Sequence, residues 1–95
     1  MVVGILKIDL LIPQVNSLKA KRAVVRSIVE KTKSKFKVSV AEVSDMDVYQ
    51  RSGIGISVVS NDRQFVNSIL DKITDFIESV GIAQVIDVKV QIMSL

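Results

Sequence analysis

The sequence lacks the two residue types that most often do chemistry near neutral pH. Its 95 residues contain no Cys and no His. Without Cys there is no disulfide framework and no thiolate nucleophile, and without either residue there are no soft metal ligands and no usual proton shuttle. General acid–base catalysis would fall to carboxylates, Lys or the single Tyr. The composition therefore counts against an enzyme, and we expect no cofactor and no metal.

Long apolar runs are also missing. No apolar stretch approaches the roughly eighteen residues that a membrane-spanning helix needs, so no membrane contact is expected. The opening segment MVVGILKID has neither the basic region nor the small-residue cleavage site of a secretory signal, which predicts a cytoplasmic protein. With 48% apolar and 24% charged residues, the chain suits one globular domain over residues 1–95.

Positive charge is concentrated in one segment. The net charge is only +3, yet residues 16–37 hold eight of the thirteen Lys and Arg residues and a single acid, Glu30. The rest of the chain carries five basic and nine acidic residues. Such asymmetry indicates an anionic partner, or else internal complementarity in which a basic helix lies beside an acidic one.

Hydrophobic periodicity predicts strands and helices in the order β-α-β-β-α-β. Apolar and polar residues alternate in four segments, each expected to be a strand with one buried face: residues 2–12, 36–41, 54–58 and 86–92. The two helices between them each carry one apolar stripe. The economical arrangement is a four-stranded antiparallel sheet with both helices on one face, which is an α+β fold of the ferredoxin-like type.

Local signals predict where the helices begin and end. Asn16 or Ser17 can cap the start of the first helix, because short polar side chains accept hydrogen bonds from free backbone N–H groups. Asn61 followed by Gln64 resembles a capping box at the start of the second helix. Gly81 suits the left-handed position that ends a helix.

Three segments taken together resemble a known family. They are SLKAKR (17–22), AEVSDMDVYQR (41–51) continuing into GIGISVVSND (53–62), and IDVKVQI (86–92). The combination is similar to the YlxP-like family of small bacterial proteins of unknown function, whose usual pattern has Trp where this chain has Tyr49. The resemblance covers nearly the whole chain and implies the same ferredoxin-like fold. Because the family's genes often lie among those for translation initiation and ribosome maturation, it also implies a link to ribosomal RNA or to a ribosome-assembly factor.

The cations of the first helix form two flanks beside its apolar stripe. Four of them lie roughly 40–100° around the helix from Leu18: Lys19, Arg22, Arg26 and Lys33. Three lie on the other flank: Lys21, Lys31 and Lys35. We expect the nucleic-acid-binding residues to be Lys19, Lys21, Arg22, Arg26 and Lys33. Cations at this spacing can follow a phosphate backbone. The alternative is that the long side chains snorkel over the edge of the core, although a merely solvated helix usually mixes charges of both signs.

The polar segment 44–52 holds a second candidate site. Tyr49, Gln50 and Arg51 combine a ring, an amide and a guanidinium, which can stack on and hydrogen-bond to a base or a peptide. The alternative is structural, with Tyr49 packed over the base of the hairpin and Arg51 paired with Glu42. Glu42 lies on the core side of its strand, so it needs either a strand end or a cation beside it.

Two short motifs in the same region are too incomplete to indicate a site. Asp45 and Asp47 form a lone D-x-D, which offers too few ligands for calcium. Gly53 and Gly55 lack the further Gly and the Lys-Ser/Thr of a phosphate-binding loop. Strand alternation places both glycines on the uncovered face of the sheet, where they flatten it.

The uncovered face has no aromatic side chains. An RNA-recognition motif shares this topology but stacks bases on aromatic residues of its middle strands. The corresponding positions here are Lys7, Asp9, Gly55, Ser57 and Val59, which excludes such a motif. The face can instead be hydrated, as in many antiparallel sheets, or can form a homodimer, either across an edge or sheet on sheet.

Two functions are compatible with these patterns. The first is a non-enzymatic binding module, associated with RNA or the ribosome through its basic first helix, with Tyr49, Gln50 and Arg51 making the discriminating contacts. The alternative is a homodimeric protein-interaction adaptor without nucleic-acid contact.

Overall fold

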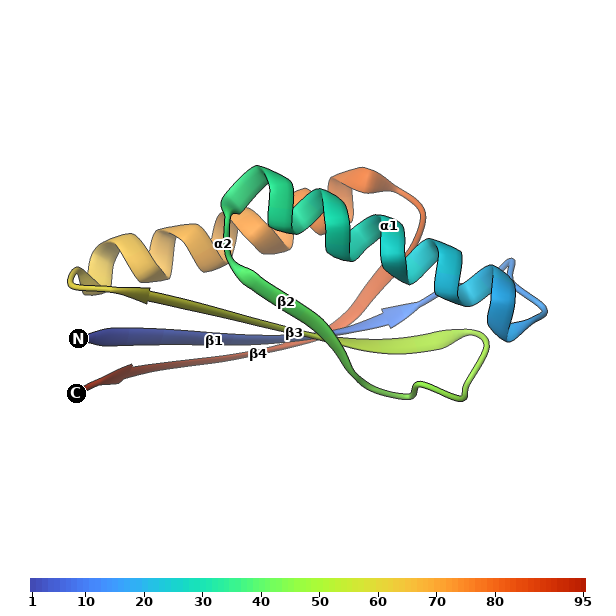
Figure 1. The fold of residues 1–95 in the computed structure, drawn as a ribbon, viewed down its shortest axis with the longest axis horizontal. Coiled ribbons are helices and arrows are strands. Elements are labelled where there is room, and N and C mark those ends of the chain that lie inside the picture. Colours follow the sequence, from blue (N-terminus) through green and yellow to red (C-terminus); the bar gives the residue numbers. More distant parts are fainter.

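The computed structural model describes residues 1–95 and has the expected order of elements. These are β1 (Val2–Leu11), α1 (Leu18–Phe36), β2 (Ser39–Ser44), β3 (Arg51–Ser60), α2 (Arg63–Val80) and β4 (Gln84–Ser94). The four strands form one antiparallel sheet in the order β2-β3-β1-β4, and both helices lie on one of its faces (Figure 1). The fold is the ferredoxin-like α+β arrangement predicted from the sequence.

The core lies between the sheet and the two helices. Even-numbered residues of β1 and β3 point into it, since side chains alternate along a strand, and Leu6, Ile8 and Ile54 are completely inaccessible to solvent. α1 packs against β2 and α2, whereas α2 lies over β1, β3 and β4. The two helices meet through Phe36 and Phe76, whose ring centroids are 5.5 Å apart. Neither helix combines the length and apolarity needed to cross a membrane.

Capping side chains define the ends of the helices. Ser17 caps α1, as one of the two predicted candidates. Asp62, rather than the predicted Asn61, caps α2 and accepts hydrogen bonds from two backbone N–H groups of the first turn. A carboxylate is favoured there because it also faces the positive end of the helix dipole. Gly81 ends α2 in a left-handed conformation as predicted, and Lys37 does the same after α1, which delays β2 until Ser39.

Two bulges change which residues face the core. In β4 the pairing with β1 skips one residue beyond Asp9, so that Val85 packs against the core while Ile86 is exposed. The alternation beginning at Ile86 had predicted that this residue is buried, which is wrong because one extra residue in a strand reverses the faces beyond it. A second bulge, at Val43 in β2, directs that side chain over Gly55 on the open face.

The helix layer approaches the sheet very closely at Gly4. A Cβ atom at this position would overlap the Cγ1 of Val66 and lie 3.1 Å from the Cδ1 of Leu70. Both side chains belong to α2 and are completely buried, so neither has free space to move into. The missing side chain of Gly4 therefore sets the distance between α2 and β1.

Replacing Gly4 by Ala should lower the free energy of unfolding by about 1–3 kcal/mol, because the added methyl group overpacks the core. Urea unfolding followed by circular dichroism measures this change. The double variant Gly4→Ala with Val66→Ala should be more stable than the sum of the two single losses predicts, since the overlapping methyl groups are gone. A single variant as stable as the wild type would contradict the close approach.

Candidate functional site

α1 presents a row of cations on the flank that faces away from α2. Its other flank is identified by Val24, which lines a groove with the loop after α2, and by Lys35, whose Nζ lies 5.1 Å from the ring centroid of Phe76. The outer flank carries four exposed residues that we call the basic stripe: Lys19, Arg22, Arg26 and Lys33. Because α1 covers β2, which is an edge strand, the basic stripe follows the outer edge of the sheet.

No carboxylate forms an ion pair with the basic stripe, although Glu30 lies on the same flank of α1, one turn from Arg26 and from Lys33. The structure contains two ion pairs, Lys7–Asp9 and Lys21–Glu42, and neither involves a residue of the stripe. The acids of α2 that could have matched these cations are exposed and make no ion pair: Asp71, Asp75 and Glu78. The charge asymmetry of the sequence is therefore not cancelled between the two helices.

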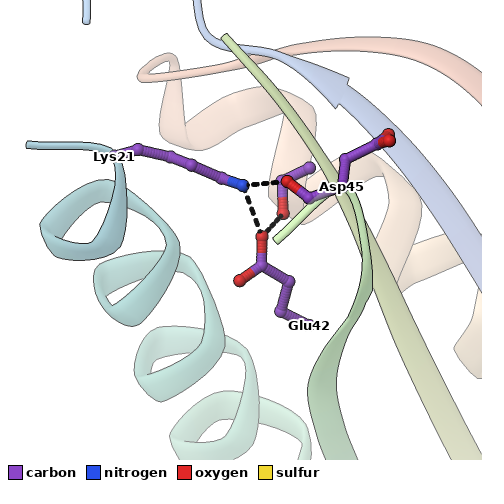
Figure 2. A network of polar contacts seen from close by, with 4 residues as sticks. Lys21, Glu42 and Asp45 are labelled. Atoms are coloured by element: carbon purple, nitrogen blue, oxygen red, sulfur yellow. Dashed lines mark hydrogen bonds and ion pairs between the residues drawn. The ribbon is translucent and has the colours of Figure 1, made fainter. Parts of the chain in front are cut away.

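Lys21 is different, and the expectation that it contacts nucleic acid is wrong. Its side chain is completely buried, its Nζ lies 2.9 Å from Oε2 of Glu42, and it donates a hydrogen bond to the backbone carbonyl of Asp45. The hydroxyl of Ser52 donates to the same carboxylate oxygen at 2.6 Å. Figure 2 shows the lysine extending from α1 toward β2 and the loop that follows it. Lys21 thus joins the helix to the sheet and is not available to a ligand.

The pairing of Glu42 corrects a second expectation. Glu42 does lie on the core side of β2 and does have a cation beside it, but that cation is Lys21 rather than Arg51. The helical period contains the signal that was missed, because Lys21 precedes Val25 by four residues and Ile28 by seven. All three lie on the buried line of α1. A lysine on that line predicts a buried partner.

Gln50 fastens the β2–β3 loop to the segment before α1. Its side-chain nitrogen donates hydrogen bonds to the carbonyl groups of Pro13, at 3.4 Å, and Val15, at 3.3 Å. Its own backbone carbonyl accepts a hydrogen bond from the N–H of Ile12 at 2.8 Å. The amide donors that a ligand would use are therefore occupied within the fold, which gives Gln50 a structural role.

Tyr49 and Arg51 flank Gln50 but do not form one site with it. Tyr49 is 48% exposed, in the loop that Gln50 fastens beside the start of α1. Arg51 begins β3 and lines a polar hollow of about 450 Å³ on the open face of the sheet, together with Lys7 and Asp9. The structure therefore holds Tyr49 in a loop that is tied to the segment before α1, and places Arg51 on the face of the sheet that the helices leave open.

The remaining features of the surface offer little chemistry. No three His, Cys, Asp or Glu side chains are grouped so that they could hold a metal ion. A groove of about 490 Å³ lies between the loop before α1 and the loop after α2, with Ile12, Val15 and Ile82 in its walls. No titratable side chain lines this groove, so it contains no group for proton transfer.

Replacing Lys21 by Met removes the charge and keeps an unbranched side chain that is one atom shorter. Glu42 would then remain largely buried with only the hydroxyl of Ser52 as a donor, so the free energy of unfolding should fall by about 3 kcal/mol. Chemical denaturation measures this loss, and adding Glu42→Leu should recover much of it because no unpaired charge is left. The exposed neighbour provides the control: Arg22→Met should change stability by less than about 0.5 kcal/mol. Equal stability of Lys21→Met and the wild type would contradict this account of the pair.

Similarity to known proteins extends over nearly the whole chain. Residues 3–90 match the model of a family described as a protein of unknown function, DUF503. The uncharacterized protein YlxP of Bacillus subtilis (strain 168) is 35% identical over 77 residues, which cover 81% of this chain and 84% of that protein. A crystal structure from Deinococcus radiodurans, provisionally named an antibiotic biosynthesis monooxygenase, aligns over 100% of this chain and 92% of its own, with a TM-score of 0.44 and 13% identity. The resemblance seen in the sequence motifs is thus confirmed, and the chain belongs to the DUF503 family of YlxP-like proteins.

Proposed function

We propose that the protein is a non-enzymatic cytoplasmic module that binds RNA through the basic stripe of α1. Its target would be ribosomal RNA or an assembling ribosomal particle, during translation or ribosome maturation. The observation that carries the proposal is that none of the four cations of the stripe has an acidic partner in the fold: Lys19, Arg22, Arg26 and Lys33. Exposed cations without internal partners are free to neutralise phosphates and to release the counterions that surround them.

The shape of the basic stripe suits a phosphate backbone. It runs from Lys19 to Lys33 along one straight helix, a length of about 21 Å at about 1.5 Å per residue. Arg22 and Arg26 lie one turn apart near its centre, and a guanidinium can bind two phosphate oxygens at once. The first turn of α1 contains no acidic residue, so the positive end of the helix dipole adds to the same potential.

Tyr49 supplies the aromatic part of the proposed contact. It is the single Tyr of the chain, and it lies exposed in the loop that Gln50 holds beside the start of α1. A base that leaves its stack near the stripe can pack on this ring, a contact that tolerates any base. Phosphates would thus supply most of the affinity, and stacking would favour single-stranded or looped RNA.

The variant Arg22→Glu with Arg26→Glu should abolish binding to ribosomal RNA at low salt while leaving the fold intact, because both side chains are exposed. Fluorescence anisotropy with a single-stranded RNA measures the affinity. For the wild type, the logarithm of the binding constant should fall with the logarithm of salt concentration with a slope of about −3, as four neutralised phosphates predict.

A matched control carries the same change of charge elsewhere. Lys31→Glu with Lys72→Glu alters two exposed cations outside the basic stripe and should retain most of the affinity. Equal losses in the two double variants would show that only net charge matters. A wild-type protein that binds no RNA at low salt would refute the proposal.

The alternative, an adaptor that binds proteins only, gives the opposite responses. Capture of a partner from lysate would then survive nuclease treatment and depend little on salt, because apolar contacts are not screened by ions. Capture that nuclease abolishes, and that weakens as salt rises, supports the RNA-binding function.

A further inference from the structure

The face of the sheet that the helices leave uncovered is apolar at one end. Near the chain termini, at the left of Figure 1, its outward side chains include Val3, Ile5, Val59 and Met93. The strand register places Val3 between Val59 on one side and Met93 on the other, so that these residues form a continuous row. Val59 is 63% exposed. The open face of an antiparallel sheet normally alternates to polar residues, so this end is suited to being covered.

Beside the apolar end, two rows of like charge cross the sheet. The register places Lys7 directly opposite Lys89, and Asp9 directly opposite Asp87. Like charges opposite each other on neighbouring strands destabilise a sheet. The basic row and the acidic row are two residues apart along the strands, a spacing of about 7 Å. Within the chain they are joined by an ion pair in which Nζ of Lys7 lies 3.4 Å from Oδ1 of Asp9. Two such rows side by side are complementary to a rotated copy of themselves.

We propose that the open face binds a second copy of this chain, sheet against sheet, about a two-fold axis between the two rows. The axis lies in the interface and runs perpendicular to the strands. Rotation about it places Lys7 of each copy over Asp9 of the other, and Lys89 of each copy over Asp87 of the other. Each charged pair occurs twice by symmetry, and the unfavourable like-charge pairs within each sheet gain opposite charges above them.

The charged rows alone fix the axis, yet the same rotation also brings apolar residues of the two copies together. On β1 it brings Ile5 of one copy over Leu11 of the other, and Val3 to the level just beyond the end of the strand. On β3 it brings Val59 beyond Arg51, to the level of Tyr49 near the end of the β2–β3 loop. One geometric operation therefore satisfies the charged rows and covers the apolar end together. A partner of unrelated sequence would not be expected to match both.

The area of the face is sufficient for a dimer. Three strands of ten or eleven residues and one of six, about 4.8 Å apart, give a flat face of about 600 Å², and the relief of the side chains increases the accessible area. Stable interfaces bury about 800 Å² on each partner, and packed sheets lie about 10 Å apart. Pairing through the edge of β4 would cover one strand only and would leave Ile5 and Val59 exposed.

Sedimentation equilibrium of the full chain tests the proposal, with a dimer expected for the wild type. Lys7→Asp places carboxylates over the Asp9 side chains of the other copy at two symmetric positions, and should raise the dimer dissociation constant at least about tenfold. Within each chain the new carboxylate gains Lys89 opposite it and loses the ion pair with Asp9, so the two changes to the fold offset each other in part. Lys7→Asp with Asp9→Lys exchanges the two charges, makes the rows complementary again, and should return the dissociation constant to near the wild-type value.

Val90→Lys separates this interface from pairing through β4. Val90 is exposed on the helix side of the edge strand and lies outside the open face, so this variant should remain dimeric. A dimer that Val90→Lys dissociates and Lys7→Asp does not would establish edge pairing and overturn the proposal. A monomeric wild type, or a charge exchange that fails to restore the dimer, would also overturn it. None of these outcomes depends on whether the basic stripe binds RNA.

Discussion

The ion pair between Lys21 and Glu42 determines how the first helix lies on the sheet. The elements that α1 packs against are β2 and α2, and β2 is a short edge strand of six residues. An apolar contact alone would allow the helix to rotate or slide, since it has no direction. The ammonium group instead bonds to the Glu42 carboxylate and to the carbonyl of Asp45, which fixes both the rotation of α1 and the start of the following loop. Burying the two charges costs desolvation free energy, and the hydroxyl of Ser52 offsets part of it.

This fixed rotation separates the cations of α1 into groups with different roles. Lys21 is buried and structural, and Lys35 lies over the aromatic rings of Phe36 and Phe76 where the two helices meet. The basic stripe is left on the far flank, away from the acids of α2. The concentration of charge in residues 16–37 therefore becomes a property of one surface, because the element that could have neutralised it lies on the other side.

The sequence was sufficient to predict the order of the strands and helices, but not to predict everywhere which residues of an element face the core. Strong alternation in β1 and β3 and the helical stripe of α2 identify these elements, because each buries one continuous face. The bulge in β4 was not predictable, since Val85 and Ile86 are both apolar and either could face the core. The helical period places Lys21 on the buried line of α1 and so predicts a buried partner for it, but it does not identify Glu42 as that partner. A shift of one residue, from Asn61 to Asp62, is the usual uncertainty at a helix end.

The family match covers residues 3–90, so the pattern SLKAKR with AEV can be interpreted through this structure. Within it, Lys21 and Glu42 are the two charges that the fold buries against each other. Arg22, the next residue in the same motif, belongs to the exposed basic stripe. The motif SLKAKR thus contains Lys21, which anchors α1 to the sheet, and Arg22, which α1 exposes to solvent. Stability measurements test the first role, and binding measurements test the second.

The basic stripe and the open face lie on different layers of the molecule, and the proposed dimer relates them geometrically. Rotation about an axis perpendicular to the strands places each strand over the same strand of the partner. Both β2 edges, and both basic stripes beside them, therefore lie on the same side of the dimer. The two stripes are then separated by the thickness of two sheets and two helix layers, roughly 30 Å at about 10 Å per packed layer. A short RNA can contact one stripe, whereas a longer or folded RNA can contact both, and its second contact is then intramolecular and strengthened by effective concentration. Dimerisation would in this way favour large, structured RNA over short fragments.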